Sequence, residues 1–364
     1  MRILIYNWRD LRHPQAGGAE VYTDAVATAW QDMGHEVTLF TSAVKDAPSE
    51  ERAGGGYRLI RRGGRHGVYR EAKRYWSAEG VGNFDLVIDE VNTRPFGCPR
   101  WVRDTPVLGL IHQVCREIWF YETPFPVALL GRYVLEPWWL RQFREIPVIT
   151  VSESSKASLE LYGLRRVTVV PEGHAPSPHR PAKKNDYPVV LYLGRLTANK
   201  RPDHAIRAFQ LAKKSLPEAK MWVVGDGPMR KKLERMAGDD VMFFGRVPTA
   251  ERERFLAEAT CLVVTSVREG WGLVVTEAAE AGTPAIAYDV PGLRDSVVAA
   301  RGVLVAPAVN QMAEAMIRQL TQWHPAATPL GSIGTIPWIE VGKRFIPKDV
   351  DDELASWNGP TITL

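Results

Sequence analysis

The sequence contains little cysteine and no long apolar run. Its three cysteines, Cys98, Cys115 and Cys261, are widely spaced, with no CxxC pair and no histidine cluster nearby. This distribution argues against a disulfide framework or a zinc site and is typical of a reducing compartment. No segment offers the ~20 uninterrupted apolar residues that a membrane-spanning helix needs. The N-terminal residues MRILIYNW read as a strand and lack the apolar region of a signal peptide, so we expect a cytoplasmic protein.

A large excess of charge and the dinucleotide fingerprint are also missing. The net charge is +4, a mildly basic balance that identifies no partner by itself, and we expect no nucleic-acid partner. A content of 45% hydrophobic and 24% charged residues is that of a globular protein, and 364 residues suffice for about two domains. No GxGxxG triplet occurs anywhere, which argues against an NAD-dependent oxidoreductase. Titration of cofactor fluorescence would test that alternative.

Short apolar runs alternate with helical patterns through the first half of the chain. Six runs read as buried strands: 2–7, 36–40, 85–89, 106–111, 147–151 and 167–170. Their Val/Ile/Leu character favours parallel strands that are covered on both faces. Helices are predicted over 19–34 and 152–163, the second with Ser152 and Ser155 as candidate caps and an end at Gly163.

The second half repeats this alternation. Its predicted strands are 188–193, 220–224, 241–244, 261–265 and 284–288. Two such series predict an α/β protein of two doubly wound, Rossmann-like domains that face each other across a cleft. The predicted parts are a first domain (1–173), a linker rich in Pro, Lys and His (174–187), a second domain (188–323) and an atypical tail with poor helical periodicity (324–364). Ligands of such folds bind at the carboxyl ends of the strands.

Glycines and cations follow several of these strands. The loop after the first strand ends in Gly17-Gly18, where a ligand can approach the backbone and a helix N-terminus favours anions. An ordinary flexible loop is an equal alternative. After strand 188–193 come Gly194, Arg195 and Lys200, placed so that both cations can converge on a phosphate. Two solvated loop cations are the alternative, which the further glycine-ended strands of VVGDGP (223–228) and FFGRVP (243–248) make weaker.

Two glutamates stand eight positions apart in the stretch VREGWGLVVTEAAEAGTPAIA (267–287). Glu269 precedes a glycine-rich helix start, and Glu277 falls within the predicted helix. The amides around Gly272 and Leu273 can face a phosphate. Glu277 can then accept hydrogen bonds from vicinal ribose hydroxyls, while Glu269 faces the opposite side of the same ligand. The alternative is a helix with two solvent-facing acids.

Together these motifs resemble one family, the GT-B retaining glycosyltransferases of family 4 (glycosyl transferases group 1). The shared motifs are Gly17-Gly18, GRLTANKRPD, VVGDGP, FFGRVP and EGWGLVVTE, in the family's order, with the two glutamates matching its E-x7-E motif. VITVSESSKASLELYGLRRVTVVPEG (148–173) is similar to the family's first-domain end. The resemblance covers roughly residues 1–322. It implies transfer of a sugar, with retention, from a UDP- or GDP-sugar to a hydroxyl acceptor such as a glycolipid, a polysaccharide or a small-molecule precursor, with no metal and no separate cofactor.

The resemblance also implies roles for individual residues. Arg195 and Lys200 would neutralise the leaving diphosphate, Glu277 would bind the donor ribose, and Glu269 would face the transferred sugar. His112, at a strand end, would contact the donor sugar or the reacting centre, although a lone strand-end histidine is more often structural. Further donor-binding positions are Gly17, Gly18, Gly194, Gly225, Arg246, Val247, Gly272 and Leu273, the segment 245–247 holding the base through its backbone.

Two regions leave alternatives open. The family usually ends with a helix that carries an aromatic residue and crosses back to the first domain, and the tail 324–364 departs from that pattern. The alternative function is therefore a catalytically silent GT-B scaffold or binding protein with an altered C-terminus.

The basic stretch 58–74 and the aromatic stretch 118–144 suggest peripheral binding to an anionic membrane at its inner face and a lipid-linked acceptor. A solvated basic face and ordinary core helices are the alternative.

Overall fold

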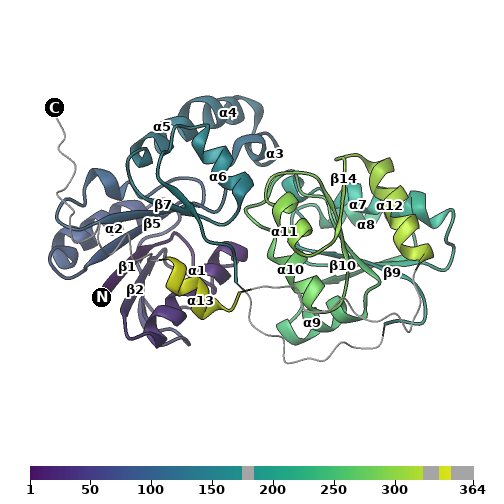
Figure 1. The fold of residues 1–364 in the computed structure, drawn as a ribbon, viewed down its shortest axis with the longest axis horizontal. Coiled ribbons are helices and arrows are strands. Elements are labelled where there is room, and N and C mark those ends of the chain that lie inside the picture. The colour runs from purple at the N-terminus through teal and green to yellow at the C-terminus, as the bar shows by residue number, and fades with distance from the viewer. Residues whose placement is uncertain (174–183, 323–335, 346–364) are drawn as a thin grey trace. The chain divides into compact units, whose positions relative to one another are not determined.

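The computed structural model describes residues 1–173, 184–322 and 336–345, which form two compact units (Figure 1). The N-terminal unit comprises Met1–Cys115, Leu130–Gly173 and the described part of Ile336–Leu364. The C-terminal unit comprises Arg116–Leu129 and the described part of His174–Thr335. Each unit is a mainly parallel sheet flanked by helices, so the predicted α/β class with two Rossmann-like units is confirmed.

The sheet of the N-terminal unit has eight strands in the order β3-β4-β2-β1-β5-β6-β7-β8. Neighbouring strands run parallel except β3 and β4, which pair antiparallel. The chain winds outward from β1 to β4 and then returns to β5 on the other side of β1, so the switch point lies between β1 and β5. The strands are β1 (Arg2–Tyr6), β2 (Glu36–Thr41), β3 (Glu50–Arg52), β4 (Arg58–Arg61), β5 (Leu86–Glu90), β6 (Val107–Leu110), β7 (Val148–Thr150) and β8 (Val167–Val169).

All six strands predicted in this half are present, and β3 and β4 are additional. β4 was not predicted, because it lies in the basic stretch 58–74 and has an arginine at each end. Leu59 and Ile60 are buried, and Arg61 is buried as well because its guanidinium pairs with Asp10 at 2.5 Å and with Glu51 at 2.7 Å. A sequence pattern cannot reveal that an arginine has buried partners from another loop.

Helices of the N-terminal unit begin where the sequence offers caps. α1 follows Gly17, whose N–H donates to the Glu20 carboxylate at 2.6 Å, and α6 follows Ser152, whose hydroxyl accepts from the Ser155 N–H at 3.1 Å. The predicted Ser152 cap is thus confirmed. The helical segments are α1 (Gly18–Asp32), α2 (Val68–Tyr75), η1 (Trp76–Gly80), η2 (Cys98–Arg100), η4 (Gly131–Leu135), α5 (Glu136–Leu140), η5 (Arg141–Phe143), α6 (Glu153–Glu160) and α13 (Trp338–Phe345).

The C-terminal unit has a six-stranded, fully parallel sheet in the order β11-β10-β9-β12-β13-β14, with its switch point between β9 and β12. Its strands are β9 (Val189–Leu193), β10 (Lys220–Val224), β11 (Val241–Gly245), β12 (Cys261–Val264), β13 (Ala285–Tyr288) and β14 (Val303–Val305). Only the three-residue β14 was absent from the prediction. The helical segments are η3 (Arg116–Ile118), α3 (Trp119–Glu122), η6 (Ala198–Lys200), α7 (Pro202–Lys213), α8 (Arg230–Met236), α9 (Thr249–Glu258), α10 (Leu273–Glu280), α11 (Leu293–Ala299) and α12 (Val309–Thr321), and α4 (Phe125–Leu130) straddles the division between the units.

The segment Arg116–Leu129 differs from the predicted domain limits. The sequence places it inside a first domain of 1–173, whereas the structure groups it with the C-terminal unit. Arg116, where the segment begins, has a φ of 41°, in the left-handed region that a non-glycine residue seldom adopts.

The sequence predicts a tail with poor helical periodicity, but part of the tail is a helix. Residues Trp338–Phe345 form helix α13, which lies beside α1 in the N-terminal unit (Figure 1). The Trp30 indole N–H donates to the Gly342 carbonyl at 2.9 Å, and the Phe345 ring meets the Trp30 ring edge-on at 5.0 Å. A Cβ on Gly342 would lie 3.2 Å from the Cβ of Ala29, so the glycine permits this close approach. Eight residues with a central glycine carry too little helical pattern to be recognised without the packing. The rest of the tail and most of the linker 174–187 lie outside the described residues.

Candidate functional site

Two of the predicted site residues meet at the switch point of the C-terminal sheet. Lys200 lies in η6 after β9, and Glu269 lies in the loop after β12. The Lys200 ammonium forms an ion pair with Glu269 Oε1, and the Ser266 hydroxyl donates to the same oxygen at 2.6 Å. Both side chains retain some exposure, 21% for Lys200 and 13% for Glu269, so an incoming ligand can reach the pair.

Further hydrogen bonds to backbone carbonyls join the two loops that carry this pair. The Thr265 hydroxyl lies 3.0 Å from the Lys200 carbonyl and 2.8 Å from the Arg201 carbonyl, and the Val267 N–H donates to the Asn199 carbonyl at 2.9 Å. Arg201 has a φ of 48°, which turns the chain from η6 into α7. The positions of Lys200 and Glu269 are thus fixed by the fold of both loops and not by the ion pair alone.

A segment from far earlier in the sequence contacts both loops. The Arg268 guanidinium, which is 5% exposed, donates through Nε to the Glu117 carboxylate at 2.9 Å. The Asn199 N–H donates to Glu122 Oε1 at 3.2 Å. Burial raises the pKa of Glu117, but the hydrogen bond and charge of Arg268 outweigh burial, and the pKa is lowered. Nothing in the sequence signals these contacts, because about 150 residues separate Glu117 from Arg268.

Glycines of the predicted motifs play different parts. Gly225 has a φ of 132°, and a Cβ there would lie 2.0 Å from the Gly194 carbonyl oxygen, so packing alone requires a glycine. Gly272, the N-cap of α10, has a φ of 95°. A Cβ on Gly194 itself would meet no atom closer than the Tyr192 hydroxyl at 3.8 Å. Packing within the described residues therefore does not require glycine at 194, as expected if a ligand approaches its backbone.

The other predicted side chains of this unit are exposed, half-buried or paired with residues outside the Lys200–Glu269 pair. Arg195 is exposed, and within the described residues its guanidinium has no carboxylate partner. Arg246 is also exposed, whereas Val247 is half-buried. Glu277 forms an ion pair with Arg252 of α9. Arg252 was not among the predicted site residues, because it lies 25 residues earlier and carries no motif of its own.

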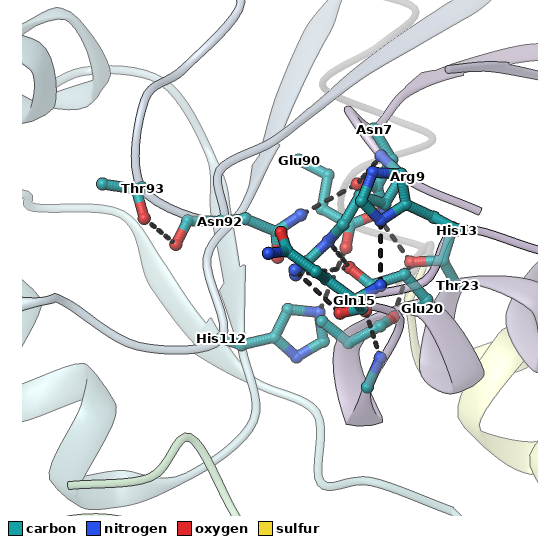
Figure 2. Close-up of polar contacts among 12 residues, drawn as sticks. Asn7, Arg9, His13, Gln15, Glu20, Thr23, Glu90, Asn92, Thr93 and His112 are labelled. Atoms are coloured by element: carbon teal, nitrogen blue, oxygen red, sulfur yellow. Dashed lines mark hydrogen bonds and ion pairs between the residues drawn. The ribbon is translucent and has the colours of Figure 1, made fainter. Parts of the chain in front are cut away.

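The switch point of the N-terminal sheet carries a second polar cluster (Figure 2). The Asn92 amide, after β5, donates to the Asn7 side-chain oxygen, after β1, at 2.8 Å. Arg9 pairs with Glu20 at 2.8 Å, and Glu20 also holds the Gly17 N–H. A Cβ on Gly17 would meet only the Glu20 carboxylate, at 3.8 Å, so nothing in the described residues crowds this glycine. Gly18 is the first residue of α1.

His112 lies between two carboxylates of the same unit. Its Nε2 is 3.5 Å from Glu90 Oε1, its Nδ1 is 3.6 Å from Glu172 Oε1, and its ring meets the Tyr22 ring edge-on at 4.9 Å. The Thr23 hydroxyl donates to the other Glu90 oxygen at 2.6 Å. Burial lowers the pKa of His112, but Glu172 and Glu90 outweigh burial and raise the pKa to about 9. His112 is therefore an imidazolium at neutral pH, and both of its ring nitrogens face acids that the sequence analysis did not select, although each follows a predicted strand.

No helix of the described residues is long and apolar enough to cross a bilayer. No group of three or more His, Cys, Asp or Glu side chains there could hold a metal ion.

These two parallel-sheet units, each with polar groups at its switch point, define the GT-B class of glycosyltransferase folds. The fold matches a sucrose-phosphate synthase from Thermosynechococcus elongatus with a TM-score of 0.79 and 21% identity, over 98% of this chain and 99% of that chain. It matches Anabaena HepE, solved with UDP-glucose, with a TM-score of 0.69 and 16% identity, over 98% of this chain and 100% of that chain.

Sequence profiles identify the family. The profile of glycosyl transferases group 1 matches residues 176–329, and that of glycosyltransferase family 4 matches residues 16–178. A 2-deoxystreptamine glucosyltransferase from Streptomyces kanamyceticus is 31% identical over 199 residues, which are 50% of this chain and 51% of the relative. The chain thus spans about half the length of the curated relatives it matches. The chain belongs to the family 4 (group 1) glycosyltransferases of GT-B fold.

Proposed function

We propose that the protein transfers a sugar, with retention of anomeric configuration, from a UDP- or GDP-sugar to a hydroxyl acceptor. The observation that carries the proposal is the Lys200–Glu269 pair at the switch point of the C-terminal sheet, surrounded by glycine-ended strands. A cation and a carboxylate side by side fit a ligand that has an anionic diphosphate at one end and hydroxyls at the other. The solved neighbour with bound UDP-glucose supports a nucleotide-sugar donor.

The diphosphate would occupy the cationic side of this site. Lys200 contacts it as a point charge, and the exposed Arg195 contacts it with a bidentate fork. The backbones of Gly194 and Gly225, with the amides around Gly272 and Leu273 at the start of α10, supply uncharged donors. As the bond between the anomeric carbon and the diphosphate breaks, these groups stabilise the charge that grows on the leaving oxygen, and no metal is needed for that purpose.

The sugar and the nucleoside would occupy the carboxylate side. Glu269 accepts hydrogen bonds from the transferred sugar after Lys200 turns from it toward the diphosphate. Glu277 leaves Arg252 or shares it to bind the ribose hydroxyls, and the backbone from Gly245 through Arg246 to Val247 holds the base. His112 remains a candidate contact for the donor sugar in this proposal. The acceptor oxygen then bonds to the anomeric carbon on the face that the diphosphate leaves, and its proton passes to a diphosphate oxygen.

A nucleotide-sugar panel tests the proposal. UDP- and GDP-sugars should raise the melting temperature of the protein, because a ligand that binds only the folded state stabilises it by mass action. The alternative, a catalytically silent GT-B scaffold, predicts binding without turnover. Hydrolysis of the bound donor in the absence of an acceptor therefore separates an enzyme from a scaffold. If no nucleotide sugar shifts the melting temperature or is hydrolysed, the donor assignment is wrong.

A peripheral location at the inner, anionic face of a membrane, with a lipid-linked acceptor, is part of the proposal. Of the seven basic residues in 58–74, five are in ion pairs with carboxylates: Arg58, Arg61, Arg62, Arg70 and Arg74. The exposed apolar side chains of η4 and α5 are therefore better candidates than the basic stretch for contact with a membrane. Tyr133 is 63% exposed, Val134 54% and Trp138 52%. Aromatic side chains on an exposed helix face suit a membrane interface. Failure to co-sediment with anionic liposomes at low salt would reject this location.

A further inference from the structure

The His112 ring is buried, and charge and packing hold it in place. Its two nitrogens lie 3.5 Å from Glu90 Oε1 and 3.6 Å from Glu172 Oε1, beyond the roughly 2.7–3.2 Å of a good hydrogen bond. Among the described residues neither ring nitrogen has a hydrogen-bond partner. Each N–H can therefore still donate to a ligand, and the orientation of the ring depends on the side chains around it.

Tyr22 of α1 is the aromatic neighbour of this histidine. The two rings meet edge-on with their centres 4.9 Å apart, and Tyr22 is fully buried. Edge-to-face contacts of this kind fix the relative orientation of two rings. The Tyr22 hydroxyl has no hydrogen-bond partner in the part of the chain that the structure describes. Tyr22 thus supports His112 with its ring and not with its hydroxyl.

Helix α13 supplies the next rings. The Trp338 ring meets the Tyr22 ring edge-on at 5.6 Å, and the Phe345 ring lies 6.2 Å from it. α13 lies beside α1, the helix that carries Tyr22 (Figure 1). A continuous series of ring contacts therefore leads from the tail through Tyr22 to His112.

The same helix contacts the backbone next to Glu172. A Cβ on Gly173 would lie 2.9 Å from the Trp338 ring and 3.0 Å from the carbonyl oxygen of Ile336, the residue two positions before the helix. A Cβ atom does not come this close to other atoms, so a glycine is needed for the chain to lie against α13. Gly173 directly follows Glu172, which faces Nδ1 of His112. α13 therefore fixes the backbone that carries one of the two carboxylates.

We propose that Trp338, Tyr22 and Gly173 are positioning residues that hold the His112 ring between its two carboxylates. Without the packing of α13, the Tyr22 ring and the Glu172 carboxylate lose their fixed places, and the histidine can turn away from them. This assigns a role to the part of the tail that the structure describes. The placement of His112 stands by itself, whereas its effect on sugar transfer rests on the proposed function.

Nuclear magnetic resonance of the histidine side chains in the full chain tests the placement without a substrate. The wild-type His112 ring should carry both protons at about pH 8, because Glu172 and Glu90 outweigh burial and raise its pKa to about 9. In Trp338→Ala and Gly173→Ala the neutral fraction at this pH should rise from about one tenth to about half or more, because the ring loses Glu172 as a partner. Neither substitution changes a titratable group, so a shift reports the position of the ring.

Controls separate positioning from general destabilisation. Tyr22→Ala should act like Trp338→Ala, whereas Tyr22→Phe keeps the ring and should leave His112 cationic. Ile339→Ala removes an apolar side chain of α13 that is 39% exposed, and it should also leave His112 cationic. Circular dichroism selects conditions in which each variant is folded. If folded Trp338→Ala and Gly173→Ala keep the wild-type His112 spectrum, the proposal is wrong. If Ile339→Ala loses that spectrum as well, α13 acts only through stability and the positioning assignment fails.

A kinetic measurement tests the link to sugar transfer. UDP affinity should be unchanged in Trp338→Ala, because the proposed diphosphate site belongs to the C-terminal unit. Turnover of any UDP- or GDP-sugar that the wild type uses should fall about tenfold, the effect of one displaced hydrogen bond. If turnover is unchanged while His112 becomes neutral, the ring is positioned as proposed but does not serve the reaction. If the wild type binds and turns over no nucleotide sugar, the proposed function fails and the resonance result still decides the placement.

Discussion

The Lys200 ammonium and the Glu269 carboxylate form an ion pair that joins the loop after β9 to the loop after β12. The two residues are 69 positions apart, and their loops are also joined by hydrogen bonds from the Thr265 hydroxyl and the Val267 N–H to backbone carbonyls. In the absence of a donor the pair satisfies both charges. A donor would replace the ion pair with two separate contacts, a phosphate for Lys200 and a sugar for Glu269.

The two glutamates of the motif should respond differently to substitution. Glu277→Ala should weaken donor binding by about one to two decades, because its ribose contacts exist in the ground state. Glu269→Gln keeps the shape and removes the charge, so it should lower the turnover number more than donor affinity. Calorimetric donor affinities set against initial rates check this. Equal, small effects of both variants would show that neither glutamate binds the donor.

Loss of either cation of the donor site should reduce both donor affinity and turnover. Lys200→Ala and Arg195→Ala remove charges that meet the diphosphate before and during its departure, so each should cost about tenfold or more in affinity and further in rate. Lys200→Ala also leaves Glu269 without its ammonium partner, although Ser266 still donates to it. Arg207→Ala, an exposed arginine on α7, serves as the control. Unchanged kinetics in both site variants would remove these residues from the mechanism.

The contact between Glu117 and Arg268 should position the loop that carries Glu269. Glu117→Ala removes the partner of a buried guanidinium, and we expect turnover to fall about tenfold while donor affinity changes less. Hydrogen exchange of the peptide 265–272 should accelerate in the same variant. Glu122→Gln is the control, because its side-chain oxygen can still accept from the Asn199 N–H. Wild-type exchange and rates in Glu117→Ala would show that the contact is not needed.

His112 should make the stability of the protein depend on pH. Its folded-state pKa of about 9 lies above the usual value of 6.5, so its contribution is fully present below about pH 6.5 and is lost as the pH rises through about 9. The loss should be on the order of 3 kcal/mol. Urea unfolding at about pH 6 and about pH 10 measures it, and His112→Gln should lack the step while the exposed His66→Gln keeps it. A step of equal size in the His112 variant would contradict this assignment.

Helix α13 should depend on the glycine that faces α1. In Gly342→Leu the new side chain would meet Met33 and Ala29, whose atoms lie 3.1 and 3.2 Å from an ideal Cβ. Overpacking of this kind costs about 1–3 kcal/mol, so the midpoint of urea unfolding should fall. Lys343→Leu introduces the same residue at a position that is 60% exposed and should leave the midpoint near its wild-type value. Similar midpoints for both variants would mean that α13 tolerates displacement from α1.

The sequence alone determined the class of fold and most of the sheet. Buried parallel strands are continuous apolar runs, and eleven such runs correspond to strands of the structure. Glycines and cations that follow those runs also predicted which strand ends carry polar groups, because the ends of parallel strands share one edge of a sheet. The Ser152 cap was predictable because its partner, the Ser155 N–H, lies only three residues away in the sequence.

Only the tertiary structure decided which side chains meet. Lys200 and Glu269, Glu277 and Arg252, and His112 with its two carboxylates are paired by loops that come together when separate strands pair. The grouping of Arg116–Leu129 with the C-terminal unit, and of α13 with α1, follows from packing and not from local propensity. A linear pattern reports which residues are apolar and at what period. It does not report long-range partners, because loop closure between distant residues is stabilised only when the whole sheet and its core have formed.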